Sequence, residues 1–433
     1  MTEPDAVKMK VEDTRMDENC PPRHIDQKIW QIIFIAIIAI AFTAIWLQIY
    51  IYLHGLLWMN DYVMANRWTI PAGVIFFSLL VGLCLKYLHA PDVITGSLVD
   101  SMQGEGSHSD YRTFPGTLLT SFFSLFSGAS IGPEGSIAFL VKEISAYVRE
   151  KLSVSKDSAL GFDVAALASA YNGIIGSPLF TAVFATELNV GKKDALTFLA
   201  WNLIAGVIGF LFFTLLGLSS FAYFFQFPPV EEMTLVYVLI AIVLGVMGAC
   251  VAILMGLAMK GIGIVVEKSF GDKIMTRILC AGVVIGVVCY FIPDLMFSGQ
   301  STILAIIENS AQIGVLMLLF MAVMKVLLLA LSFKSGYLGG PIFPTIFTCT
   351  MIGLALSLVF PGIPAGIFVL CIMAAVVTVA LGAPLTAILL VFVVSRADQN
   401  TAALFVVSSV VALIIGIAIR QKREKRAAGK AET

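Results

Sequence analysis

Charged side chains are scarce in this chain, because only 13% of its 433 residues are Asp, Glu, Lys or Arg. A soluble domain carries about 25% charged and roughly 45–50% apolar residues, whereas 59% of this chain is hydrophobic. Most of the chain is therefore expected to be solvated by lipid. Acidic and basic residues nearly balance, with a net charge of -1, which excludes the basic footprint of a nucleic-acid-binding protein.

Metal-binding and disulfide patterns are missing too. The seven cysteines lie far apart without a CxxC pair, and the four histidines are equally scattered. No nucleophile–base pair stands within the apolar segments. The sequence therefore predicts no metal site, no cofactor and no enzymatic activity.

Long apolar runs dominate what is present. A helix needs about 20 apolar residues to cross the hydrocarbon core, and eight segments approach or exceed that length. They are 29–53, 69–88, 195–216, 235–265, 277–292, 313–331, 364–381 and 402–419. These runs predict an all-α integral membrane protein.

Other apolar segments are too short or too interrupted to cross alone. They are 114–126, 136–148, 164–175, 178–188, 342–359 and 385–394, and Gly, Pro, Ser and Asn bound them. In lipid, broken helices are tolerated only where protein buries them or where they line a cavity. When such segments recur in two halves of a transporter, they indicate its binding site.

Two glycine-rich breaks have this recurrence. Gly132-Pro133-Glu134-Gly135-Ser136 lies in the first half, and Gly339-Gly340-Pro341-Ile342-Phe343-Pro344 lies in the second. A small-Pro-Leu helix start follows each, and Pro178 lies 44 residues after Glu134 just as Pro384 lies 44 residues after Gly340. The equal spacing favours an internal repeat over the general abundance of Gly and Pro in membrane helices.

Each break offers an anion site. Proline suits the first turn of a helix, so a helix from about Glu134 would direct its positive N-terminus into the first break. Two such ends facing each other would hold a partly dehydrated anion without a full positive charge, and moderate binding lets an ion leave. The candidate anion-binding residues are Gly132, Pro133, Gly135, Gly340, Ile342 and Phe343.

Glu134 is the sharpest functional candidate. An ionisable residue inside a span is costly and indicates function. A carboxylate can occupy an anion site in place of the ion, and protonation would release it, so Glu134 is predicted to be both gate and proton carrier. The alternative is a glutamate that only stabilises its own helix dipole.

For other polar residues, a functional and a structural role are both open. Glu187 is either a proton-handling group or a surface residue ahead of the polar stretch 189–194. Lys325 stands in an apolar run, where it would snorkel or neutralise a carboxylate, and a structural role is favoured. Asp92 is either part of a third backbone end near the pathway or a plain N-cap. The aromatic run 221–227 is interpreted as interface belt and core.

The motifs resemble those of the CLC family of chloride channels and chloride/proton antiporters. Gly132-Pro133-Glu134-Gly135 resembles the family's GREGP motif, and Gly340-Pro341-Ile342-Phe343-Pro344 resembles its GxFxP motif. Ala383-Pro384-Leu385-Thr386 is similar to its penultimate-helix motif. The likeness spans about 29–419 and is nearest to a divergent bacterial branch that carries GPE in place of GRE.

This resemblance implies a homodimer with one anion pathway per subunit and an inverted-repeat bundle of tilted and broken helices. It places the gating glutamate at Glu134 and the anion-holding amides at Ile342 and Phe343. The family's early serine has no counterpart in Leu88-His89-Ala90-Pro91. Its inner proton glutamate would fall near Leu188, so the usual proton acceptor is missing unless the preceding Glu187 substitutes for it. Its ion-contacting tyrosine and its cytoplasmic nucleotide-binding modules have no counterpart either.

Three functions remain open at this stage. The first is an anion/proton antiporter gated by Glu134, and the second is a passive, voltage-gated-type anion channel. The third is a membrane enzyme or scaffold that keeps the fold without transport. Chloride is preferred to fluoride as the ion, because the fluoride branch has other motif variants.

The expected organisation has four parts. A polar N-terminal segment covers 1–27, two inverted halves cover 28–218 and 219–419, and a basic tail covers 420–433. The first residues lack a signal-peptide h-region, and basic residues after an apolar helix belong on the cytoplasmic side. We therefore expect a multi-pass cell-membrane protein with both termini in the cytoplasm.

Overall fold

The computed structural model describes residues 29–88, 90, 111–155, 158–188, 195–221 and 226–431. The predicted N-terminal segment 1–27 and the candidate Asp92 lie outside this part. The longer helices of the first half are α1 (Ile29–Trp58), α3 (Thr69–Tyr87), α5 (Phe114–Phe126), α6 (Pro133–Lys151), α7 (Ala159–Ile175), α8 (Phe180–Glu187) and α9 (Ala195–Leu215). Those of the second are α10 (Leu235–Phe270), α11 (Ile274–Phe291), α14 (Val315–Ser335), α15 (Ile342–Val359), α16 (Ala365–Leu381), α17 (Pro384–Ser395) and α18 (Gln399–Ala431).

Short helices complete the described part. They are α2 (Asp61–Ala65), η1 (Tyr111–Thr113), η4 (Pro293–Leu295), α12 (Ile303–Glu308) and α13 (Ser310–Ile313). Apart from one isolated antiparallel bridge, the described elements are all helical. The prediction of an all-α fold is confirmed.

Proline and glycine set the ends of the broken helices. Pro133 and Pro384 stand in the first turns of α6 and α17, where a missing N–H costs nothing. α7 and α16 end at Gly176 and Gly382, with φ of 76° and 67°. Glycine adopts this left-handed conformation without a Cβ penalty. Each stop leads directly into the next short helix.

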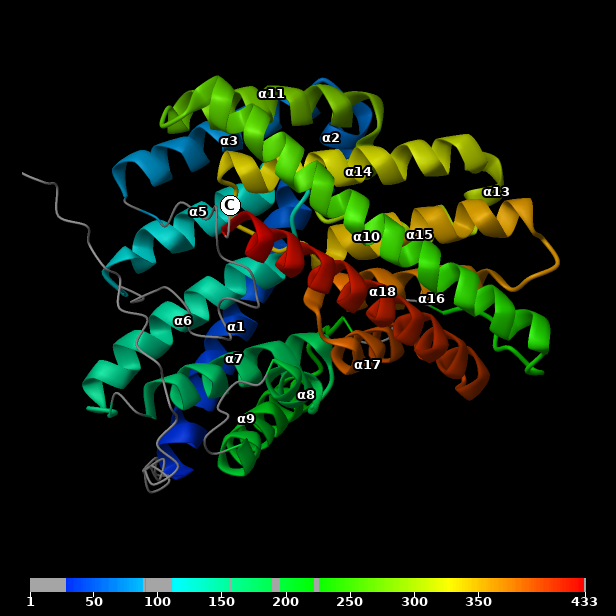
Figure 1. Cartoon of the computed structure of the whole chain (residues 1–433). Helices are drawn as coiled ribbons and strands as arrows, with labels where there is room; N and C mark the ends of the chain where they lie inside the picture. Colours follow the sequence, from blue (N-terminus) through cyan, green and yellow to red (C-terminus); the bar gives the residue numbers. More distant parts are fainter. Residues whose placement is uncertain are drawn as a thin grey trace, which may run out of the picture.

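Corresponding helices pack together in the two halves of the chain. In the first half, α1, α7 and α9 pack on one another, and in the second α10, α16 and α18 do the same (Figure 1). The short helices α8 and α17 join the halves by packing against each other. This arrangement is the inverted-repeat bundle that the sequence predicts, although the boundaries at 28–218 and 219–419 stay predictions.

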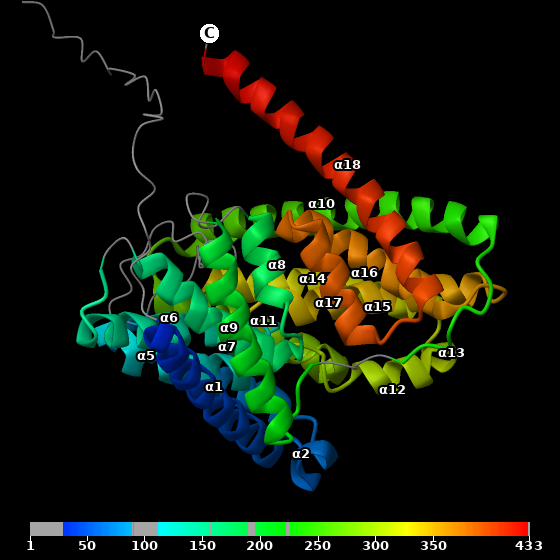
Figure 2. The ribbon, with the colours of Figure 1, turned by 90° about the horizontal axis from the view of Figure 1, so that it is seen from below.

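Eight helices of the described part are long and apolar enough to cross a membrane. Seven are predicted spans: α1, α3, α9, α10, α11, α14 and α18. The eighth is α15, which the sequence placed among the interrupted segments, although it has 18 residues. The predicted span 364–381 becomes α16, with only 17 residues. α18 continues well past residue 419 and projects beyond the other helices (Figure 2).

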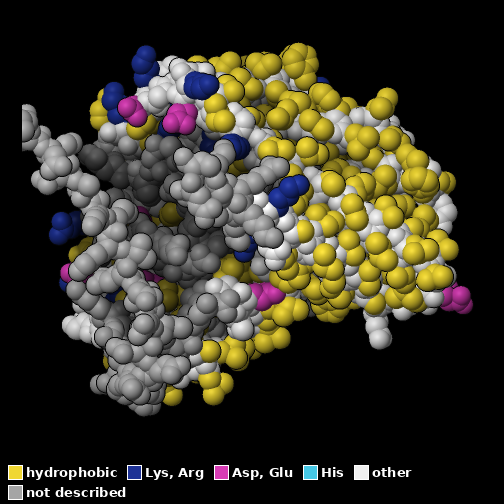
Figure 3. Space-filling model, viewed as in Figure 1, with side chains coloured by type: hydrophobic (Ala, Val, Ile, Leu, Met, Phe, Trp, Pro, Cys, Tyr) yellow, Lys and Arg dark blue, Asp and Glu magenta, His cyan; other side chains and the backbone are white. Residues whose placement is uncertain are grey.

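The outer surface is suited to lipid. Large apolar side chains are exposed along α10, among them Leu239, Val243 and Leu254 at 55–64%. Figure 3 shows a broad hydrophobic face with few charges on the side formed by α10, α14 and α18. The chain is a multi-pass membrane protein.

Candidate functional site

The two glycine-rich breaks meet inside the bundle. The N–H of Gly132 donates to the carbonyl of Gly340, and the N–H of Gly340 donates to that of Gly132, both at 2.8 Å. The Ser136 hydroxyl adds a bond to the Leu338 carbonyl at 2.9 Å. Backbone from the first half is thereby paired directly with backbone from the second, as the matching breaks suggested.

The close approach of the two breaks explains why glycines stand in them. A Cβ on Gly135 would overlap the carbonyl of Gly339, and a Cβ on Gly132 or Gly340 would overlap the Glu134 side chain. Backbone cannot move aside as a flexible side chain can. At Gly135 every residue larger than glycine is therefore excluded unless the two halves separate, whereas a Cβ at Gly132 or Gly340 would displace the Glu134 side chain.

Glu134 lies at this junction, in the first turn of α6 beside Pro133. The residue is only 4% exposed. Its Oε1 accepts the backbone N–H of Ile342 at 2.8 Å. Its Oε2 has no hydrogen-bond partner among the described residues. The carboxylate thus occupies the N-terminus of a second helix, α15, which is a favourable place for an anion.

Ile342 and Phe343 open α15, as the sequence placed them. Pro341 stands at the N-cap, so the first backbone donor of the helix is the Ile342 N–H that Glu134 accepts. The Phe343 ring packs edge-to-face on Phe221, with 4.3 Å between the ring centres. All seven predicted gating and anion-binding residues are therefore neighbours in space, while their roles stay predictions.

Two cavities adjoin the carboxylate. The large cavity, of about 330 Å³, lies between α6, α10, α15 and the end of α16. The small cavity, of about 10 Å³, has room for roughly one water-sized particle. Three residues line both: Glu134, Tyr171 and Ile342. The bond between Glu134 and Ile342 thus lies where the cavities meet.

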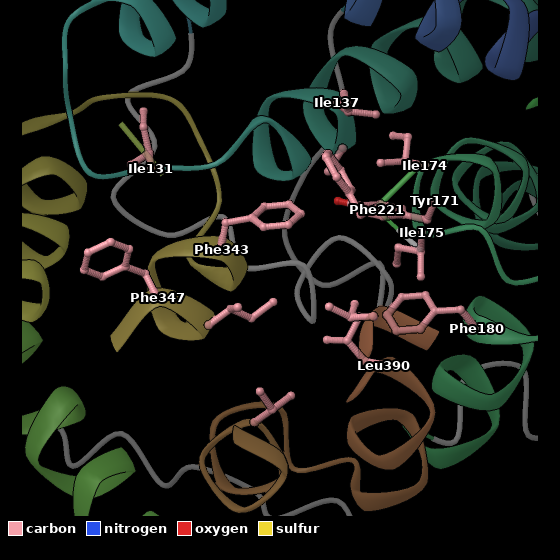
Figure 4. Close-up of a cluster of buried hydrophobic side chains, with 14 of the residues drawn as sticks. Ile131, Ile137, Tyr171, Ile174, Ile175, Phe180, Phe221, Phe343, Phe347 and Leu390 are labelled. Carbon is pink, nitrogen blue, oxygen red and sulfur yellow. The ribbon is translucent and has the colours of Figure 1, made fainter. Parts of the chain in front are cut away.

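Apolar side chains form most of the small cavity's wall. They are Ile174, Ile175, Phe221, Ile342, Phe343, Ile346, Leu390 and Val394. Figure 4 shows several of them arranged around a common space, contributed by α7, α15, α17 and the segment after α9. An anion there would shed most of its water and depend on a few backbone donors.

Sequence reasoning missed Tyr171 and the position of Phe221. Tyr171 lies in a helix that is apolar on nearly every side, so no periodicity distinguishes it. The run 221–227 was interpreted as interface belt and core; Phe221 is buried, and what the sequence did not indicate is its contact with Phe343. Only the fold brings both residues to the cavities.

Glu187 lies away from Glu134, at the end of α8. Its Oε1 accepts the N–H of Leu385 at 2.7 Å. Its Oε2 accepts the N–H of Thr386 at 2.7 Å and the hydroxyl of Thr386 at 2.6 Å. The carboxylate therefore caps the N-terminus of α17 and joins the two halves a second time.

Lys325 is also separate from the junction. It is 0% exposed, so it does not snorkel to the membrane surface. Its Nζ donates to the carbonyls of Leu295 and Phe297, at 3.0 and 2.7 Å, and lies 4.8 Å from the centre of the Phe347 ring. The partners are thus backbone carbonyls rather than the carboxylate that the sequence analysis considered.

Broken helices whose N-termini meet inside a membrane protein are typical of ion transporters. The sequence model of the voltage gated chloride channel family matches residues 77–416. The chain belongs to this family, the CLC family that its motifs resemble. None of the curated proteins matches its sequence.

Solved structures agree with the fold. A slow cyanobacterial Cl⁻/H⁺ antiporter is similar with a TM-score of 0.78 at 18% identity, over 90% of this chain and 94% of its own. A CLC-type fluoride/proton antiporter reaches 0.72 at 18% identity, over 89% and 94%. A eukaryotic CLC transporter reaches 0.70 at 16% identity, over 90% and 71%. At such identities the likeness defines the fold alone.

Proposed function

We propose that this chain moves chloride, or another small inorganic anion, across the membrane through a pathway gated by Glu134, in exchange for protons. One observation carries the proposal: the Glu134 carboxylate sits on the first N–H of α15, at the meeting point of two cavities. In this position it occupies the place of an anion and separates the two spaces.

The gate would open when the carboxylate leaves α15. Protonation removes the negative charge that the helix N-terminus attracts, so a protonated Glu134 competes less well with an arriving anion. The side chain then moves out and carries its proton, while the anion takes the freed N–H of Ile342. One residue thereby exchanges an anion for a proton.

The apolar wall of the small cavity supports a weakly hydrated anion. Burying a charge costs more for a small, strongly hydrated ion than for a large one, and few donors are available to compensate. We therefore place chloride and nitrate ahead of fluoride.

Flux from liposomes tests this function. Purified protein is reconstituted with an internal chloride probe and an external pH probe, and a chloride gradient is imposed. In the wild type we expect protons to move in the direction opposite to the chloride that flows down its gradient. In Glu134→Gln we expect no proton movement, because the glutamine side chain cannot bind or release a proton. Glu267→Gln, at an exposed position on α10, is the matched control and should behave as the wild type. If proton movement in wild-type liposomes does not exceed that in protein-free liposomes, the antiport proposal is wrong.

A passive anion channel is the second candidate. Glu187, the residue offered as a substitute proton acceptor, is engaged in three hydrogen bonds to α17. Without a second proton-handling site, chloride would cross uncoupled. The reversal potential separates the candidates, since a channel follows the chloride gradient alone and an antiporter also responds to pH.

We also propose a homodimer in the cell membrane with both termini in the cytoplasm, as the family implies. Exposed apolar side chains on α9 and α18, including Leu211 and Val410, leave surface for a second copy. The mass of the detergent-solubilised protein tests the dimer, and accessibility of a C-terminal tag in sealed vesicles tests the orientation.

A further inference from the structure

Tyr171 connects α7 to the gate. Its hydroxyl donates to the backbone carbonyl of Glu134 at 2.7 Å, and the residue is only 1% exposed. The bond reaches the main chain in the first turn of α6, directly at the residue whose carboxylate covers α15. It thus acts on the position of Glu134 rather than on its charge.

Tyr171 also stands where the two cavities meet, because it lines both of them. Among the residues that line the small cavity, Glu134 and Tyr171 are the two whose side chains carry polar atoms. Figure 4 shows the tyrosine among the side chains that surround this space, beside Phe221 and Ile175. A substitution at Tyr171 therefore alters both the hydrogen bond to Glu134 and the lining of the two cavities.

The tyrosine is held by a rigid support. Its neighbour Asn172 accepts the N–H and the hydroxyl of Thr181 at 3.0 and 2.9 Å, and donates to the Pro178 carbonyl at 2.8 Å. α7 then ends at Gly176 in the left-handed conformation. The end of α7 is thereby fixed to the start of α8, so Tyr171 provides a fixed reference point.

Glu134 needs such a reference. One carboxylate oxygen has a single bond, to Ile342, and the other has no partner among the described residues. The backbone of α6 must supply the rest of its alignment. We propose that Tyr171 is a positioning residue for the Glu134 gate: its hydroxyl fixes the first turn of α6 so that the carboxylate covers the Ile342 N–H. This inference rests on the proposed function of Glu134.

The test uses Tyr171→Phe, which keeps the ring and removes only the hydroxyl. Two measurements follow it: amide hydrogen exchange of the peptide that contains Ile342, and chloride flux from liposomes. We expect both to rise about fivefold, because a net hydrogen bond changes an equilibrium by about that factor. Tyr337→Phe is the matched control. That tyrosine is equally buried, but its hydroxyl bonds to Ser78 and Ile278.

A second background separates positioning from a general effect. In Glu134→Ala no carboxylate remains to be aligned, so adding Tyr171→Phe should change neither measurement further. An equal increase in that background, or unchanged exchange at Ile342 in Tyr171→Phe alone, would overturn the inference. If Glu134→Ala leaves flux at the wild-type level, the proposed gate fails instead. The exchange measurement then still decides whether Tyr171 positions the carboxylate.

Discussion

Replacing Glu187 by alanine should loosen the contact between α8 and α17. The carboxylate accepts two backbone N–H groups and one hydroxyl at 2.6–2.7 Å, all from Leu385 and Thr386. These donors belong to the N-terminus of α17. Among the described residues, the N-cap residue Ala383 makes no side-chain hydrogen bond to this helix, so Glu187 serves as its cap. The alanine variant leaves the donors to water, as far as water can reach them.

The size of the effect follows from the geometry. Losing an N-cap costs about 0.5–2 kcal/mol, and losing a negative charge at a helix N-terminus costs about 0.3–1 kcal/mol when exposed. Glu187 is half-buried and bridges two halves of the chain. We therefore expect a loss of about 2–3 kcal/mol in the free energy of unfolding. Glu187→Gln keeps one accepting oxygen and should lose about half as much.

Thermal unfolding in one detergent, followed by tryptophan fluorescence, measures this loss. The expected order of Tm is wild type, then Glu187→Gln, then Glu187→Ala, with Glu267→Ala equal to the wild type as an exposed control. A Tm of Glu187→Ala equal to that of the control would refute the reasoning. If Glu187→Gln keeps its Tm but loses proton flux, Glu187 handles protons and does not serve as a cap.

The backbone junction and the buried lysine give two more tests. Gly135→Ala should fail to give a monodisperse peak in size-exclusion chromatography, because its Cβ would overlap the Gly339 carbonyl, whereas Gly261→Ala, with open space around it, should be tolerated. A well-behaved Gly135→Ala would contradict the close approach of the two breaks. Lys325→Met should lower the free energy of unfolding by about 1–3 kcal/mol, because it leaves the Leu295 and Phe297 carbonyls without their donor. Unchanged stability would mean that the cost of burying the amine cancels those bonds.

Much of the fold could be predicted from the sequence, because lipid imposes a simple length rule. Seven predicted spans are helices that are long and apolar enough to cross a membrane, since a long apolar run has few alternatives in a bilayer. Segment 342–359 was misjudged because Pro341 and Pro344 suggest an interruption. Both prolines lie at the start of α15, where the helix tolerates them.

The site was predictable where glycine and proline mark it. The breaks at 132–136 and 339–344 identified the junction and Glu134, because few residue types permit such close backbone approach. The partners of Glu187 and Lys325 were not predictable, since their donors and acceptors are backbone groups that carry no sequence signal. The role of Tyr171 was not predictable either, because its hydroxyl bonds to a backbone carbonyl of α6, a separate helix.

The bond between Glu134 and Ile342 joins residues 208 positions apart in the chain. Contacts at such separation form slowly, because closing the long intervening loop costs conformational entropy. During synthesis, α6 therefore enters the bilayer with its carboxylate and glycine backbone unpaired, well before α15 exists. The pathway therefore cannot assemble until α15 has been made, because Ile342 supplies the N–H that Glu134 accepts.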